Sequence, residues 1–187
     1  MTGLFSAAGS TPSDSGFELK SARFNDDDTP YLSRTPTVAG NRKTWTWSGW
    51  VKRGNPTQRG FLFSSGTAVG SNEDGIEFDG IVLRAYSYVS SSFVWQTTSS
   101  AYYRDPSAWY HILVYYDSTQ ATSADRARLY VNGERLTALA TDTQPSQNAD
   151  CGFFNTTTEH RIGQALGSHK WDGYLAEVHF IDGTALT

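Results

Sequence analysis

The sequence predicts an all-β protein, an antiparallel jelly-roll sandwich of two sheets, and three observations support this prediction. Several short segments alternate apolar and polar side chains and are rich in aromatic and β-branched residues. Glycine, asparagine and aspartate separate these segments, which is typical of turns between strands. The chain has 187 residues, of which 14% are aromatic and 18% charged, and this length fits one β-sandwich.

The first half of the chain contains one long strand and several shorter ones. Residues 44–52 alternate clearly, so Trp45 and Trp47 face the core whereas Trp50 faces outward among polar residues. An aspartate and a glycine at positions 79 and 80 favour a hairpin turn. The shorter strands are expected at 17–24, 31–33, 60–66, 75–79, 80–88 and 93–97.

The clearest pattern lies in a hairpin beyond the middle of the chain. Residues 109–117 predict one strand and residues 128–131 the strand that pairs with it, with a polar loop at 117–125. Asn132-Gly133 predicts a type I′ turn after the second strand, because that turn needs positive φ at both central residues.

The last quarter of the chain returns to a β pattern. We expect a loop at 141–155, a short strand at 159–162 and a long final strand within 171–183. Strict alternation would place Tyr174 and Phe180 on one face of this final strand. Seven side chains are expected to form the shared core: Trp45, Trp47, Ile112, Val114, Leu129, Val131 and Val178.

The chain is expected to comprise an extended N-terminal arm at 1–16 and the sandwich at 17–187. The arm is small and polar, so it is either a frayed terminus or a segment that docks on a neighbouring subunit. No apolar run approaches the roughly 20 residues that a membrane span requires. The single cysteine excludes an intramolecular disulfide, and the net charge of −4 disfavours a nucleic-acid partner.

An acidic turn follows the first strand. Asp26, Asp27 and Asp28 are adjacent, and carboxylate oxygens are the ligands that calcium prefers. The turn lacks the alternate spacing of a calcium loop, so the simpler interpretation is three solvated carboxylates. Apart from this calcium candidate, no cofactor is expected.

Several motifs, in their order along the chain, resemble the laminin-G-like, concanavalin A-like lectin/glucanase superfamily. The version with Tyr31-Leu32-Ser33 near the start and a glycine-terminated final strand is similar to that of tailed-bacteriophage virion proteins. The motifs that carry the resemblance are Thr44–Lys52, Trp109–Asp117, Leu129–Gly133, Arg161–Gly163 and Trp171–Gly183.

This resemblance implies a two-sheet jelly roll with a binding or structural role. We expect a non-catalytic virion module, as a decoration, fibre or tail-associated protein on the surface of the head or tail. Such a protein would be made in the host cytoplasm. Its partners would be other virion proteins, host surface glycans and further copies of itself in a homo-oligomeric assembly.

The outward face of the hairpin and of the long tryptophan strand is the expected carbohydrate-binding surface. Aromatic rings stack on sugar faces while their polar tips bind hydroxyl groups. The competing interpretation is that these side chains pack beneath a loop. The residues of this predicted surface are Trp50, His111, Tyr115, Arg128 and Tyr130.

Catalysis is not expected, because the paired carboxylates of the glucanases are incomplete here. Starting at Glu77, Asp79 fits the spacing, but Ile81 and Val82 occupy the places that a second glutamate would need. The alternative is a glycoside hydrolase or lyase that acts on bacterial surface polysaccharide through Glu77 and Asp79.

Overall fold

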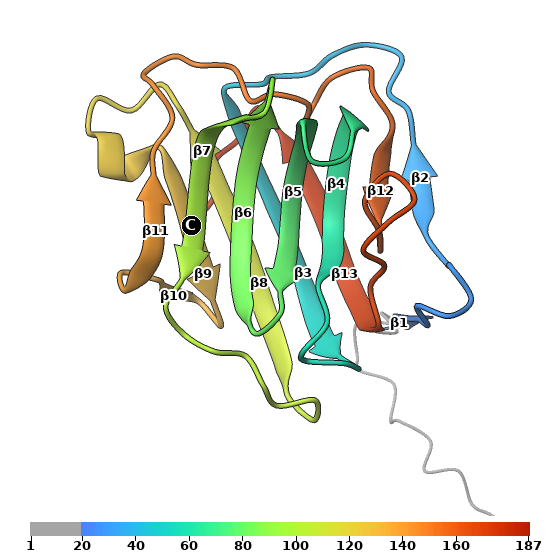
Figure 1. The fold of residues 1–187 in the computed structure, drawn as a ribbon. Helices are drawn as coiled ribbons and strands as arrows, with labels where there is room; N and C mark the ends of the chain where they lie inside the picture. Colours follow the sequence, from blue (N-terminus) through green and yellow to red (C-terminus); the bar gives the residue numbers. More distant parts are fainter. Residues whose placement is uncertain (1–19) are drawn as a thin grey trace, which may run out of the picture.

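Two antiparallel sheets lie face to face in the computed structural model, which describes residues 20–187 (Figure 1). We call them sheet A, with strand order β1-β13-β3-β8-β9-β10, and sheet B, with order β11-β7-β6-β5-β4-β12-β2. Sheet A contains β1 (Ser21–Phe24), β3 (Thr44–Arg53), β8 (Trp109–Asp117), β9 (Ala127–Val131), β10 (Glu134–Arg135) and β13 (Gly173–Asp182). Sheet B contains β2 (Leu32–Arg34), β4 (Gly60–Ala68), β5 (Asn72–Asp79), β6 (Val82–Val89), β7 (Ser92–Ser99), β11 (Leu139–Thr143) and β12 (His160–Ile162). The predicted all-β sandwich is confirmed.

The core between the sheets is built from large aromatic side chains. The ring of Trp45 stacks on Tyr116 with centroids 5.1 Å apart and meets the edge of Phe154 at 5.3 Å. Six of the seven predicted core residues are buried, and Val178 is half-buried and packs against them. Truncating one such aromatic side chain costs about 3–5 kcal/mol, so these rings dominate the stability of the sandwich.

The hairpin around β8 and β9 follows its prediction closely. Asn132 and Gly133 have φ of 53° and 83°, as a type I′ turn requires. Asn132 Oδ1 also accepts a 2.9 Å hydrogen bond from the backbone N–H of His111, which fixes the turn to β8. The polar loop before β9 contains one short 3₁₀ helix, η1 (Ser123–Asp125).

One strand lies where the sequence predicted a loop. The expected loop at 141–155 begins inside β11, which pairs with β7 at the edge of sheet B. The edge strand has only partly buried and exposed residues, so it lacks the alternation that would have identified it. The part of the predicted strand 17–24 before residue 20 and the arm at 1–16 lie outside the described residues.

A β-bulge interrupts β13 where sequence alternation predicted a regular strand. The register against β3 shifts between Ala176 and His179, and Glu177 has φ of 49°. One extra residue in a strand reverses the face of the sheet to which each later side chain points. Tyr174 is therefore exposed, whereas Phe180 packs against the core, and the prediction that they share a face is wrong.

Candidate functional site

The outer face of sheet A brings the five predicted binding residues onto one surface. In the register of β3 and β8, Trp50 lies opposite His111. In the register of β8 and β9, Tyr115 lies opposite Arg128, and Tyr130 lies opposite Leu113. All five side chains stand on alternate positions of neighbouring strands, so they point away from the core.

Trp50 and His111 form the accessible part of this surface. Trp50 is 41% exposed although it is a large apolar side chain, and its ring lies 5.2 Å from that of His111 at an angle of 52°. Partial burial lowers the pKa of His111, so its imidazole is neutral at pH 7 and offers one N–H donor and one nitrogen acceptor. A ring with a neutral polar neighbour suits a sugar, which presents both C–H faces and hydroxyl groups.

Tyr115 and Arg128 are less accessible than predicted. The guanidinium carbon of Arg128 lies 4.8 Å from the centre of the Tyr115 ring and covers it, so Tyr115 is only 6% exposed. Arg128 is held there by a 2.6 Å ion pair with Asp125 of η1. The prediction that Tyr115 offers a contact ring is therefore wrong, because a cation–π contact already occupies its outer face.

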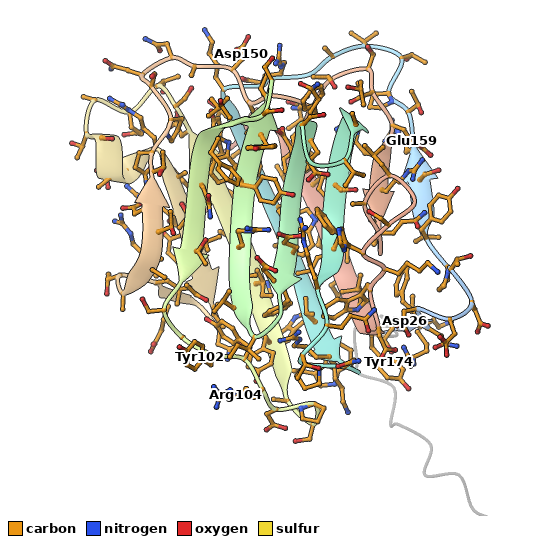
Figure 2. The ribbon with its side chains drawn as sticks, viewed as in Figure 1. Asp26, Tyr102, Arg104, Asp150, Glu159 and Tyr174 are labelled. Atoms are coloured by element: carbon orange, nitrogen blue, oxygen red, sulfur yellow. The ribbon has the colours of Figure 1, made fainter. Side chains whose placement is uncertain are left out.

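Two further rings extend this surface beyond the predicted set. Trp109 and Tyr174 are each 38% exposed, and their ring centroids are 6.4 Å apart on either side of Lys52. Figure 2 labels Tyr174 near the lower end of the sandwich. Alternation in 109–117 already placed Trp109 beside His111, whereas the β-bulge concealed Tyr174 from sequence reasoning. We call Trp50, Trp109, His111, Tyr130 and Tyr174 the ring face.

The outer face of sheet B carries a buried ion cluster, with the exposed ring of Phe93 beside it against Tyr86. Glu77 has no exposed surface and accepts hydrogen bonds from Arg59 Nε at 2.8 Å and from Arg84 Nε at 2.7 Å. Burial raises the pKa of this carboxyl, and the two guanidinium groups offset part of the increase. Arg84 also pairs with Asp79 at 3.2 Å, so both carboxylates of the alternative catalytic site share one arginine.

The same cluster extends along β5 to Glu73. The Tyr86 hydroxyl donates a 2.9 Å hydrogen bond to Glu73 Oε1, and Arg59 Nη2 reaches the Tyr86 oxygen at 3.4 Å. Glycine at position 75 makes room for Tyr86, because an added Cβ would lie 2.8 Å from its ring. Glu73 and Glu77 thus share one face of β5, an arrangement that the incomplete carboxylate motif did not indicate.

The acidic turn, the calcium candidate of the sequence, lies among polar and basic side chains. Asp28 accepts a 2.8 Å hydrogen bond from Asn25, whereas Asp26 and Asp27 line a pocket together with Arg59 and Lys170. Within residues 20–187, no three His, Cys, Asp or Glu side chains gather closely enough to hold a metal ion. The basic neighbours oppose cation binding and favour the simpler interpretation of the turn, while calcium there stays a prediction.

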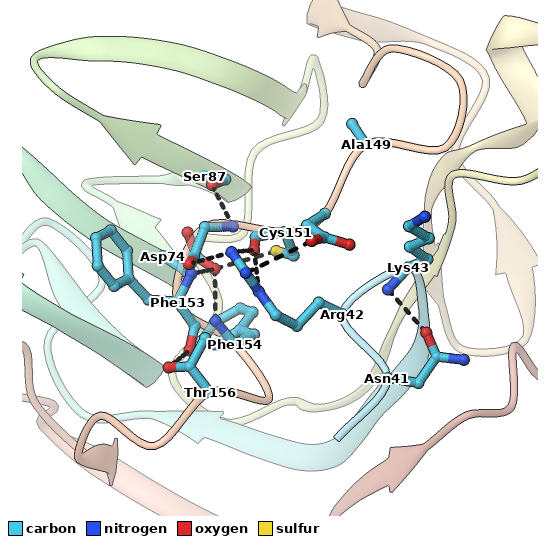
Figure 3. A network of polar contacts seen from close by, with 12 residues as sticks. Asn41, Arg42, Lys43, Asp74, Ser87, Ala149, Cys151, Phe153, Phe154 and Thr156 are labelled. Atoms are coloured by element: carbon cyan, nitrogen blue, oxygen red, sulfur yellow. Dashed lines mark hydrogen bonds and ion pairs between the residues drawn. The ribbon is translucent and has the colours of Figure 1, made fainter. Parts of the chain in front are cut away.

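A second buried carboxylate, Asp74, has a structural role at one end of the sandwich (Figure 3). Its Oδ2 accepts from the backbone N–H groups of Phe153 and Phe154 at 2.6 and 2.7 Å and from the Cys151 thiol at 3.0 Å. Arg42 clamps the carbonyl of Cys151 from outside at 2.9 Å. Burial raises the pKa of the Cys151 thiol, so this cysteine serves packing rather than nucleophilic chemistry.

A groove of about 610 Å³ opens between β2, β12 and the end of β13. Phe63, Ile162 and Phe180 form apolar parts of its lining, while Arg34 and His160 supply polar groups. His160 is buried, donates through Nδ1 to the Thr158 carbonyl at 2.9 Å, and accepts from the Asn155 N–H through Nε2 at 3.0 Å. Because Nε2 accepts, Nδ1 carries the proton, and the imidazole is neutral. None of the predicted site residues lines this groove.

This sandwich, with rings on one outer face and ions on the other, is a lectin-like fold. The chain belongs to the concanavalin A-like lectin/glucanases superfamily: the Laminin_G_3 family matches residues 26–187. No curated protein matches the sequence. Within the described residues, no helix is long and apolar enough to cross a membrane.

Several solved structures share the fold. The native heptameric SAP-like pentraxin of Limulus polyphemus has a TM-score of 0.60 and 18% identity, with 90% of this chain and 77% of that chain covered. Mouse laminin alpha1 domains LG4-5 have a TM-score of 0.63 and 11% identity, covering 97% of this chain and 46% of that chain. The CBM40 of the Ruminococcus gnavus IT-sialidase, solved with α2,3-sialyllactose, has a TM-score of 0.54 and 11% identity, covering 83% and 93%. At these identities the likeness shows the fold alone.

Proposed function

We propose that this protein is a non-catalytic carbohydrate-binding module whose binding surface is the ring face of sheet A. The observation that carries the proposal is the row of partly exposed rings, with Trp50, Trp109 and Tyr174 each about 40% accessible on one outer face. Single exposed rings are common on soluble proteins, whereas several gathered on one face indicate an interaction site. These rings stack on the faces of the sugar, and the neutral His111 and the Tyr130 hydroxyl supply hydrogen bonds to it.

The likeness to known folds supports a glycan as the ligand. The family takes its description from lectins and glucanases, and one similar structure is a carbohydrate-binding module holding sialyllactose. Another is the binding domain of a paraclostridial mosquitocidal protein. Sialylated and other host surface glycans are therefore the first ligands to examine.

The state of Glu77 supports a non-catalytic role. A retaining glycosidase needs one carboxylate free to attack and a second one able to give a proton. Glu77 is inaccessible and bound by two arginines, and Asp79 is paired with one of them. A substrate would have to displace an arginine before it could reach Glu77, so the pair cannot act together as the structure stands.

We further propose that the module works on a virion surface, as a decoration, fibre or tail-associated protein in a homo-oligomeric assembly. The support is the order of motifs that resembles bacteriophage virion proteins. Its partners would be other virion proteins and host glycans, and it would be made in the host cytoplasm. Cryo-electron microscopy of particles carrying the protein would test this, and its absence from every particle would contradict the proposal.

A glycan array with matched variants tests the ring face. Trp50→Ala removes a ring from the proposed surface, whereas Phe93→Ala removes a ring of similar exposure, 44%, from sheet B. Binding by wild type and Phe93→Ala, with loss in Trp50→Ala, supports the proposal. No bound glycan for any of the three proteins would contradict carbohydrate binding and leave only the structural role.

A further inference from the structure

A second polar pocket lies beside the ion cluster of sheet B and shares no residue with the ring face. Its volume is about 370 Å³, which suits one sugar unit. Figure 2 marks its position with Asp26, at the end of the sandwich where Tyr174 also lies. We call it the mixed-charge pocket, and its lining residues are Asp26, Asp27, Gln58, Arg59, His169 and Lys170.

One wall of the mixed-charge pocket consists of positioned hydrogen-bond donors. Arg59 is fixed by its 2.8 Å ion pair with Glu77 and by a 3.3 Å contact from Nη1 to His169 Nε2. Burial and the adjacent Arg59 lower the pKa of His169, so its imidazole is neutral. An imidazole that accepts at Nε2 carries its proton on Nδ1 and can donate there. The ring of His169 stacks on Phe61 at 6.1 Å, so this wall is rigid before any ligand arrives.

The opposite wall consists of acceptors that have no cation of their own. Within residues 20–187, Asp26 and Asp27 form no ion pair within 4.0 Å, and neither does the ammonium group of Lys170. The pocket is thus lined by positive and negative side chains that form no ion pair with each other. Such a pocket offers separate partners to an anionic group and to hydroxyl groups on the same ligand.

We propose that the mixed-charge pocket binds an acidic sugar unit, with its carboxylate or phosphate on Arg59 and Lys170 and its hydroxyl groups on Asp26 and Asp27. An anion alone would meet the repulsion of the two aspartates, and a neutral sugar would give Lys170 no anionic partner. The inference goes beyond the proposed function, because the pocket lies outside sheet A's ring face and recognises a different chemical feature.

Isothermal titration calorimetry of the full chain with four probes tests this inference. The probes are glucuronate, glucose 6-phosphate, glucose and inorganic phosphate. We expect both acidic sugars to bind at least about tenfold more tightly than glucose or inorganic phosphate, because only they engage both walls. Comparison of the two acidic sugars identifies whether carboxylate or phosphate is preferred. Equal binding of inorganic phosphate, or no binding of either acidic sugar, would overturn the inference.

Matched variants locate the binding. Lys170→Met should weaken both acidic sugars about tenfold, whereas Lys43→Met, just before β3 and outside both surfaces, should leave them unchanged. Asp27→Asn should weaken the acidic sugars about threefold without weakening inorganic phosphate. Acidic-sugar binding that survives Lys170→Met but is lost in Trp50→Ala would assign the ligand to the ring face. That result would overturn this inference and leave the proposed function intact.

Discussion

The outer faces of the two sheets start from similar alternating strands and end in opposite states. On sheet A, the outward side chains of β3 and β8 include Trp50 and Trp109, which remain about 40% exposed. On sheet B, the outward Glu77 of β5 is entirely buried beneath Arg59 and Arg84. Alternation decides which way a side chain points, but the groups that lie over it decide whether water reaches it.

The difference also concerns what each face contributes to stability. Exposed rings leave apolar surface in water, whereas a buried ion cluster must recover the desolvation of its charges. Breaking such a cluster by removing one member is far more costly than trimming an exposed ring, because the remaining charges stay buried. We therefore expect sheet B's outer face to be sensitive in stability measurements and the ring face to be sensitive in binding measurements.

The largest expected effect follows from removing the centre of the ion cluster. Glu77→Ala leaves Arg59 and Arg84 without their shared carboxylate, so it should lower the free energy of unfolding by about 3–5 kcal/mol. Trp50→Ala should lower it by about 1 kcal/mol or less, because this ring is partly in water. Urea unfolding measures both values, and similar losses for the two variants would contradict the comparison.

A smaller effect is expected from a ring that the sequence reasoning did not assign to the site. Trp109→Ala should weaken an oligosaccharide ligand about fivefold, because one stacking contact is lost. A monosaccharide held by Trp50 and His111 should keep its affinity. Titration of wild type and variant with saccharides of increasing length checks this, with Phe93→Ala as the control. Equal weakening at every length would mean that Trp109 acts by supporting the fold of the ring face.

The pH dependence of stability gives a third test, in which both faces take part. Burial lowers the pKa of His111 on sheet A and, with Arg59, that of His169 beside sheet B. Well above about pH 6.5 both imidazoles are neutral in the folded and unfolded chain and contribute no pH dependence. As the pH falls through about 6.5, the unfolded chain takes up protons first, so the free energy of unfolding decreases.

Urea unfolding between about pH 7.5 and about pH 5 should show this decrease, at most about 1.4 kcal/mol per pH unit for each histidine. His111→Gln and His169→Gln should each flatten the curve. Because Glu77, whose pKa is raised by burial, acts in the opposite direction, the test is the difference between wild type and variant: curves of equal slope would contradict the assignment of neutral imidazoles.

The smallest effect separates the two histidines by salt. The pKa of His169 is lowered partly by the charge of Arg59, whereas that of His111 is lowered by burial alone. At roughly 1 M salt the Debye length is about 3 Å, so the Coulombic share should shrink. NMR titration should show the pKa of His169 rising with salt and that of His111 unchanged. Equal responses would show that Arg59 does not act on His169.

Much of the sheet A surface could be predicted from sequence, since it depends on local alternation. Trp45 and Trp47 are buried and Trp50 is exposed as the pattern in 44–52 indicates. The Asn132-Gly133 turn is likewise a local property of two residues. Tyr115 was misjudged because its cover, Arg128, comes from another strand, and no pattern within 109–117 contains that information.

The sheet B surface could not be predicted, because its parts come together only on folding. Glu77, Arg84 and Arg59 come from β5, β6 and the segment before β4, and His169 joins them from a loop far along the chain. Likewise, Asp26 and Asp27 alone suggest a cation site, but the fold brings Lys170 and Arg59 to the same pocket. Residue types indicate chemistry, but the sign of the neighbouring charges follows from tertiary structure.

The bulge at Glu177 determines which side chains of β13 reach the outer surface of sheet A. Because one surplus residue separates the outward Tyr174 from the inward Phe180, deleting it would leave β13 in regular register with β3. Either the tyrosine would then turn inward or the phenylalanine would turn to water. A single-codon deletion could therefore remodel the recognition surface in one step, where point substitutions would exchange rings one at a time.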